Sequence, residues 1–169
     1  MTTSDRAALR AQVERFARER PRSVASDGAG RLLDVASGKA LALDWPRVAR
    51  AEERVDARTR RPYLVLSLDD GTEIALADQG IAFAPRAVAG GAPEGLPAAV
   101  CFRDLSQAES QLSHFLLHHP EEPADRSHLA IFLFCLAVVA GARAAGFDVA
   151  PEERRLEGLL AELEARGAR

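Results

Sequence analysis

The four histidines of the chain all lie within HFLLHHPEEPADRSH, residues 114–128, together with three carboxylates. His114 and His118 are four residues apart, so on a helix they share a face and could act as a pair of metal ligands. A structural metal site needs three or four converging ligands, and the spacing of this stretch forces no third ligand to join the pair. We therefore predict no metal cofactor, and we keep His114 and His118 as the residual metal candidates.

The same stretch can instead be the junction between two helices. Histidine near the end of a helix complements the negative end of the helix dipole. Pro120 and Pro123 would then break the chain, and Asp125 or Ser127 would cap the next helix. With Leu112 at the centre of the buried stripe, the helical period points both paired histidines away from the core. We favour this interpretation.

Six arginines between residues 47 and 61 form a second group that could bind a ligand. Guanidinium groups bind phosphate, so nucleic acid or an anionic lipid headgroup would be the partner. Glu52, Glu53 and Asp56 are interleaved with them. We expect only Tyr63 to offer a stacking ring, whereas proteins that bind single strands usually present several aromatics. Phosphate binding is therefore an alternative function. The six residues are Arg47, Arg50, Arg54, Arg58, Arg60 and Arg61.

Patterns typical of enzymes are missing from the sequence. It contains no phosphate-binding glycine loop and no serine in a nucleophile elbow. Cys101 and Cys135 lie far apart, unlike a metal-binding cysteine pair, and both are expected to be buried free thiols. Cys101 and a histidine could form a nucleophilic pair, but no third group is implied that would orient them. We predict that the protein is not an enzyme and has no cofactor.

The composition is that of a soluble globular protein. Hydrophobic residues make up 47% of the 169 residues and charged residues 28%. The first residues contain no apolar signal core, so we expect a cytoplasmic protein, and the excess of arginine over lysine suggests a bacterial genome rich in GC. Residues 1–61 have a charge balance of +5 and residues 62–169 one of −8. This asymmetry can steer a partner or support self-association.

Residue periodicity divides the chain into three regions, which we expect to form one compact domain. Residues 1–22 form an N-terminal unit with a helix at 4–20, capped by Ser4 and ended by Pro21. Residues 23–103 read as antiparallel strands separated by turn signals, with a loop of Gly, Pro and Ala at 85–97. Residues 104–169 form a helical region packed on the sheet. The predicted fold class is α+β, with an antiparallel sheet or partial barrel.

The best hairpin is YLVLSLDDGTEIALAD, residues 63–78. A three-residue loop would pair Leu66 with Ile74 and Leu64 with Leu76, so the large apolar residues lie on one face. The same register places Gly71 where a left-handed backbone is needed. Asp44 and Pro46 could open one helical turn before it, followed by a strand. Residues 98–102 are predicted as a last short strand.

Three helices are predicted after the strands, over 104–118, 126–146 and 151–166. Asp104 or Ser106 is the expected cap of the first, and Pro151 and Gly167 mark the start and end of the third. The uncharged stretch at 129–142 is too short to span a bilayer, which needs about 20 residues, so we predict a helix buried nearly all round and no transmembrane segment. The short connection after it predicts that the second and third helices are antiparallel neighbours.

The order of elements resembles a pleckstrin-homology-like barrel capped by a helix. LALDWPRV and the hairpin with its DG turn carry this resemblance, which covers about residues 23–118. It implies a binding or adaptor domain for peptides or phosphate-bearing headgroups, and it implies no catalysis.

These observations favour a cytoplasmic protein-interaction or adaptor module that associates with itself, forming a homo-oligomer, or docks an unidentified protein partner. The contact would be made by the helical region or by an exposed sheet edge. Two alternatives remain, namely phosphate recognition by the arginines at 47–61 and a metal-dependent role of the histidines at 114–128.

Overall fold

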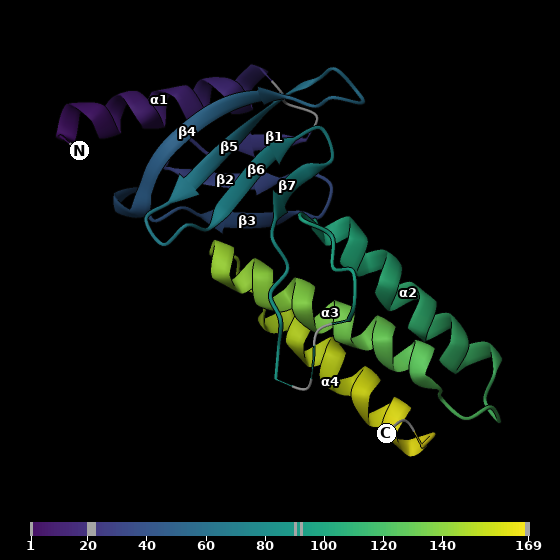
Figure 1. Cartoon of the computed structure of the whole chain (residues 1–169). Coiled ribbons are helices and arrows are strands. Elements are labelled where there is room, and N and C mark those ends of the chain that lie inside the picture. The colour runs from purple at the N-terminus through teal and green to yellow at the C-terminus, as the bar shows by residue number, and fades with distance from the viewer. Residues whose placement is uncertain (1, 20–22, 90, 92, 168–169) are drawn as a thin grey trace.

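The computed structural model describes residues 2–19, 23–89, 91 and 93–167. An N-terminal helix leads into seven antiparallel strands, and three helices follow (Figure 1). This confirms the predicted α+β fold class. The helices are α1 (Thr3–Glu19), α2 (Phe102–His118), α3 (Arg126–Ala145) and α4 (Ala150–Ala165), with a one-turn helix η1 (Trp45–Arg47). The strands are β1 (Val24–Ser26), β2 (Arg31–Asp34), β3 (Lys39–Ala42), β4 (Val48–Val55), β5 (Pro62–Leu68), β6 (Glu73–Ala77) and β7 (Gly80–Phe83).

The strands form two sheets, one of order β1-β2-β3 and one of order β4-β5-β6-β7. Leu32 and Leu41 of the first sheet join the core with alternate residues of the second, such as Leu64, Leu66 and Leu76. This alternation is what a strand buried on one face requires. Helix α1 contacts β1, β4 and η1, and its buried residues Val13, Phe16 and Ala17 extend the same core.

The central hairpin has the predicted register. Leu64 pairs with Leu76 and Leu66 with Ile74, while the Leu68 amide donates to the Thr72 carbonyl at 2.8 Å. Gly71 has φ +81°, so it supplies the left-handed conformation that the three-residue loop needs. The predicted turn before the hairpin is η1, and the predicted strand after it is β4.

Asp34 connects the two sheets. Its side chain is buried and accepts hydrogen bonds from the Ile81 amide at 2.9 Å and the Ser37 amide at 3.0 Å. Ile81 belongs to β7, so the carboxylate occupies the outer edge of that strand. Gly80 lies so close that an added Cβ would stand 2.4 Å from an Asp34 carboxylate oxygen.

Two predicted helix caps are wrong. Thr2, not Ser4, precedes α1, and its hydroxyl accepts from the Asp5 amide at 3.2 Å. Because Thr and Ser are both good caps, residue type alone could not choose between them. Cys101 precedes α2, and Asp104 reaches back to the Cys101 amide at 2.8 Å instead of capping the helix. The predicted end of the first helix at Pro21 lies outside the described residues.

The strand predicted at 98–102 is also wrong. Among the described residues, its ladder contact is a single bridge between Val100 and Phe83. Cys101 is the residue just before α2 and Phe102 is the first residue of the helix, so too few extended residues remain for a strand. The sequence did not signal β7 either, because it is only four residues long and follows the short turn at Asp78 and Gln79.

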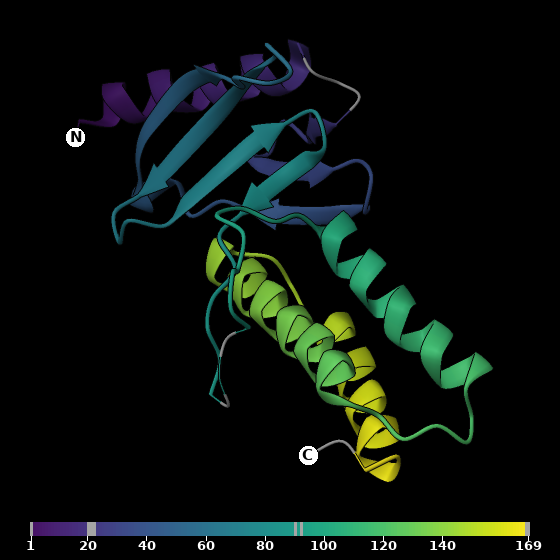
Figure 2. The same ribbon diagram turned by 45° about the vertical axis from the view of Figure 1, so that its right-hand side comes forward.

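The three C-terminal helices form an arm that extends from the sheets (Figure 2). Helices α3 and α4 run antiparallel side by side, as predicted, and both contact α2. The arm meets the sheets at a cluster of three aromatic rings, Phe83, Phe102 and Phe147, whose centroids lie 4.9 to 5.8 Å apart. A backbone bridge between Leu41 and Phe147 adds to this joint.

Candidate functional site

Helix α3 has an apolar side that other helices do not cover. Asp125 caps its start by accepting from the Ser127 and His128 amides, and Gly146 ends it with φ +111°. The side that faces α2 and α4 carries Cys135, Val138 and Ala142, which are fully buried. The prediction of a helix buried nearly all round is therefore right for this side and wrong for the other. The opposite side is exposed or half-buried and carries no charge. We call this surface the α3 ridge, made of Leu129, Ala130, Leu133, Phe134, Leu136 and Ala140.

Two hollows border the α3 ridge. One lies between α2 and α3, has a volume of about 370 Å³, and is lined by Ala130 and Phe134 of the ridge. The other lies between α3 and α4, has a volume of about 380 Å³, and is lined by Leu136 and Ala140. The segment between β7 and α2 crosses the C-terminal half of α3, where the Arg86 amide donates to a carbonyl of the helix (Figure 1). In the N-terminal half of the ridge, Ala130 is exposed and Leu129, Leu133 and Phe134 are half-buried.

Charged side chains flank the ridge. Arg126 at the start of α3 and Glu157 of α4 are exposed, and neither makes an ion pair or hydrogen bond within the described part of the chain. Arg143, at the other end of α3, is paired with Glu153 of α4. Unpaired charges of opposite sign therefore lie toward opposite ends of an uncharged surface.

The sequence predicted an apolar α3 but gave no signal for its open side. The stretch at 129–142 has no charged positions and so no amphipathic pattern, and periodicity could not separate a covered side of the helix from an uncovered one. Within the described residues, α3 is the one helix long and apolar enough to cross a membrane by length and composition. Its packing between α2 and α4 is that of a core helix, but only 44% of its most apolar window is buried.

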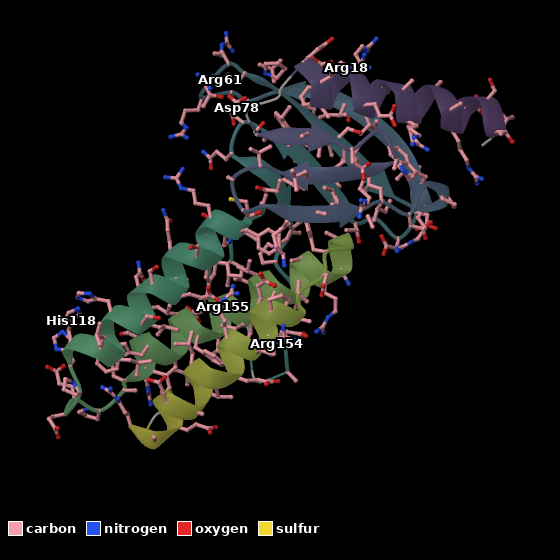
Figure 3. The ribbon with its side chains drawn as sticks, turned by 180° about the vertical axis from the view of Figure 1, so that it is seen from behind. Arg18, Arg61, Asp78, His118, Arg154 and Arg155 are labelled. Atoms are coloured by element: carbon pink, nitrogen blue, oxygen red, sulfur yellow. The ribbon has the colours of Figure 1, made fainter. Side chains whose placement is uncertain are left out.

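The candidate arginines are mostly paired with carboxylates of the sheets. Arg47 bonds Asp69 and Asp70, Arg50 and Arg54 bond Glu52, and Arg61 bonds Asp78 at 2.6 Å. Figure 3 shows Arg61 and Asp78 together at one end of the molecule. These contacts raise the pKa of three guanidinium groups and depress the pKa of Glu52, whose first cause is the hydrogen bond from Arg54.

Among these six, the guanidinium groups of Arg58 and Arg60 make no ion pair with a carboxylate in the described part of the chain, although the Arg58 amide donates to Asp56 at 3.0 Å. Both lie in the turn between β4 and β5, where Arg60 has φ +60°. The remaining four are distributed over both ends and the face of the second sheet. The six arginines therefore do not converge on one phosphate-sized site.

The histidines lie at the far end of the arm. His114 and His118 are exposed, as helical phase predicted, and their ring centroids are 4.4 Å apart. Figure 3 shows His118 near the end of α2. His119 lies 2.9 Å from a Glu122 oxygen, and His128 stacks on Phe115 at a centroid distance of 3.6 Å. No group of three or more metal-binding side chains occurs among the described residues.

A charged cleft of about 790 Å³ lies where the sheets meet the arm. Lys39 of β3 donates to Glu152 at 2.9 Å and to the Asp148 carbonyl at 2.7 Å. Arg155 lies 3.4 Å from Glu109 and 3.6 Å from Glu152, so opposite charges alternate across the cleft. Sequence reasoning did not single out Lys39, although a lone lysine among many arginines was a usable signal. A compact ammonium group fits these close contacts.

Both cysteines are buried and free, as the sequence predicted. Burial raises the pKa of Cys101 and raises that of Cys135 to about 12. A nucleophilic cysteine needs a depressed pKa, because the thiolate is the reactive form. The environment of each thiol therefore works against nucleophilic catalysis.

Comparison with known proteins finds no matching family model, no matching curated protein and no matching solved structure.

Proposed function

We propose that this protein is a cytoplasmic interaction module, without catalysis of its own, that associates with itself through the α3 ridge. The observation that carries the proposal is the uncharged, half-buried side of α3, which runs from Leu129 to Ala140 along the arm. Exposed apolar surfaces of this kind favour protein contacts, because burying them removes apolar area from water.

A second copy suits this surface chemically. A partner must itself be apolar, since placing a charge on the ridge would desolvate it without compensation. The ridge has that character, and the hollows on its two sides could receive the protruding side chains of a second ridge. In a two-fold contact each copy presents the same patch, so such a patch must be self-complementary.

The flanking charges favour an antiparallel arrangement. If two α3 helices packed in parallel, Arg126 of each copy would lie beside Arg126 of the other. If they pack antiparallel about a point near Leu133, Arg126 of one copy approaches the level of Ala140 and Glu157 of the other. Unlike charges at the rim of an interface set orientation and exclude wrong arrangements.

Sedimentation over a wide range of protein concentration tests this proposal. We expect the wild-type chain to form dimers, and Leu133→Asp to weaken them at least about 30-fold, as loss of an apolar anchor does. Leu117→Asp is the matched control, because Leu117 is 74% exposed on α2 and lies outside the ridge. Circular dichroism checks that both variants are folded.

Charge exchange tests the arrangement. Arg126→Glu and Glu157→Arg should each weaken the dimer, and the double variant should restore it, because both contacts are then reversed together. A chain that is monomeric at every concentration, or a Leu133→Asp variant that dimerises like the wild type, would contradict the proposal.

The pleckstrin-homology-like resemblance is part of the proposal. Two antiparallel sheets of three and four strands followed by a helix support it, and it would make the sheets an adaptor scaffold that carries the arm.

A further inference from the structure

We propose that His114 and His118 chelate a divalent transition-metal ion at the C-terminal end of α2. The site would take Zn²⁺, Ni²⁺ or Cu²⁺, the divalent ions that imidazole ligands suit. This inference is independent of the α3 ridge, because the two histidines lie on a different helix and outside that surface.

The geometry of the pair fits two ligands of one ion. Each histidine nitrogen binds zinc at about 2.0–2.1 Å, so two ligand nitrogens lie roughly 3 Å apart. The ring centroids are already 4.4 Å apart with 43° between the ring planes, and both side chains are exposed. Small rotations about the side-chain bonds can therefore direct one nitrogen of each ring at a shared ion.

The other two histidines, His119 and His128, make contacts with other residues, so we expect the ion to bind at His114 and His118. His119 contacts Glu122, and the Nδ1 atom of His128 accepts from the Asp125 amide at 3.2 Å while its ring stacks on Phe115. His114 and His118 make no hydrogen bond or ion pair with any other described residue. Metal binding therefore costs them no existing polar contact.

The backbone beneath the pair is held in place. Arg166, after the end of α4, donates to the Leu116 carbonyl at 2.6 Å and to the His119 carbonyl at 2.5 Å. These contacts hold the last turn of α2, which carries His118. A helix whose end does not fray keeps the two ligands at their four-residue spacing, so less ordering entropy is lost on binding.

Two protein ligands leave the remaining coordination positions of the ion open. No third metal-binding side chain joins the pair within the described residues. The bound ion would complete its shell with water, or with donor atoms of another molecule. We expect an exchangeable ion, with Cu²⁺ bound most tightly, following the general order of affinity for divalent metals.

Titration of the untagged chain with Zn²⁺ and with Cu²⁺ tests the site. Calorimetry should give one ion per chain, and electron paramagnetic resonance of the Cu²⁺ form should report two nitrogen ligands. His114→Ala and His118→Ala should each weaken binding at least about tenfold, since either change leaves a single ligand. His119→Ala should bind like the wild type.

A spacing control separates chelation from general affinity of histidine for metals. Combining Ser113→His with His114→Ala keeps four histidines but places the pair five residues apart, about 140° around the helix. We expect this variant to bind as weakly as His114→Ala. The proposal is overturned if the spacing control binds like the wild type, if either single alanine variant does, or if the wild-type chain binds no ion.

Discussion

Carboxylates in the turns of the sheets bind the backbone beside them. Asp27, Asp56 and Asp70 each accept from an amide two or more residues farther along the chain, at 2.6 to 3.0 Å. Such bonds favour the charged form, so they lower the pKa of Asp56 and Asp70. The pKa of Asp27 is lowered first by the hydrogen bond from the Arg31 side chain and then by the one from the Arg31 amide. These side chains fix the turns that set the register of the strands.

Asp70 gives a prediction about acid stability. Its pKa falls from 3.8 to about 2, first because of the Thr72 amide and then because of the Thr72 side chain and Arg47. A carboxyl whose pKa is lower in the folded state adds stability above its unfolded value, and loses it as pH falls through the folded value. Asp70→Asn should therefore unfold more easily than the wild type near neutral pH.

The difference in unfolding free energy between the wild type and Asp70→Asn should become smaller as the pH falls from about 4 to about 2. Urea unfolding across that range measures it, and carbon NMR of the Asp70 carboxyl follows the titration directly. An NMR midpoint near 3.8 would contradict the assignment.

At the residue scale, the sequence predicted which side of a helix a residue lies on better than it predicted which residues contact each other. Helical phase placed His114 and His118 on the solvent side, because the period of a helix is a local property. It could not pair Arg61 with Asp78, since their contact depends on how two separate turns meet. The interleaved Glu52 was visible as a neutralising charge because its arginines lie two residues away on the same strand.

At the element scale, the hairpin from Tyr63 to Asp78 was predictable because alternation, turn residues and loop length all favoured one register. The division into two sheets was not predictable. Nor was the contact that connects the two sheets, in which the carboxylate of Asp34, at the end of β2, accepts from the Ile81 amide of β7. A single acidic residue at a strand end carries no pattern that would reveal this contact.

Gly80 and Gly71 provide a matched test of that contact. Both have positive φ, but a Cβ at Gly71 meets nothing within 4 Å, whereas one at Gly80 collides with Asp34. Gly71→Ala should cost about 1 kcal/mol for backbone strain. Gly80→Ala should cost at least about 3 kcal/mol, because it also displaces the carboxylate from two amides.

Urea unfolding of the two alanine variants gives these free energies. Adding Asp34→Ala to Gly80→Ala should cost less than the sum of the two single changes, since each removes the same bonds. Equal losses at Gly71 and Gly80 would show that the close approach is unimportant.

At the scale of the whole molecule, the sheets and the arm are joined by a buried ion pair. The side chain of Lys39 is 19% exposed and that of Glu152 only 6%. The Lys39 ammonium also lies 5.5 Å from the centre of the Phe102 ring, beside the aromatic cluster. The lone lysine of the sequence marked Lys39 as unusual, but its pairing with Glu152 could not be predicted, because the two residues are far apart along the chain and neither belongs to a motif.

Replacing Lys39 should destabilise the whole chain. Lys39→Met leaves Glu152 buried without its closest cation, which should lower the free energy of unfolding by about 3 kcal/mol. The pair of Arg31 and Asp27 is the control, because the Arg31 side chain is 64% exposed, and Arg31→Met should cost less than about 1 kcal/mol.

Chemical denaturation compares these variants. Combining Lys39→Met with Glu152→Met should return the stability to within about 1 kcal/mol of the wild type, since no buried charge is left unpaired. If Lys39→Met lowers the free energy of unfolding no more than Arg31→Met does, the pair of Lys39 and Glu152 does not hold the sheets and the arm together.

The contacts of Arg166 attach the C-terminal end of α4 to the end of α2 and to the start of α3. Arg166 holds the end of α2 by two carbonyls, and its own carbonyl accepts from the Ala124 amide just before α3. The residue that follows α4 thus holds the connection between α2 and α3 in place. Local opening at the C-terminal end of α4 would release that connection as well, so the arm should exchange its amide protons as one cooperative unit.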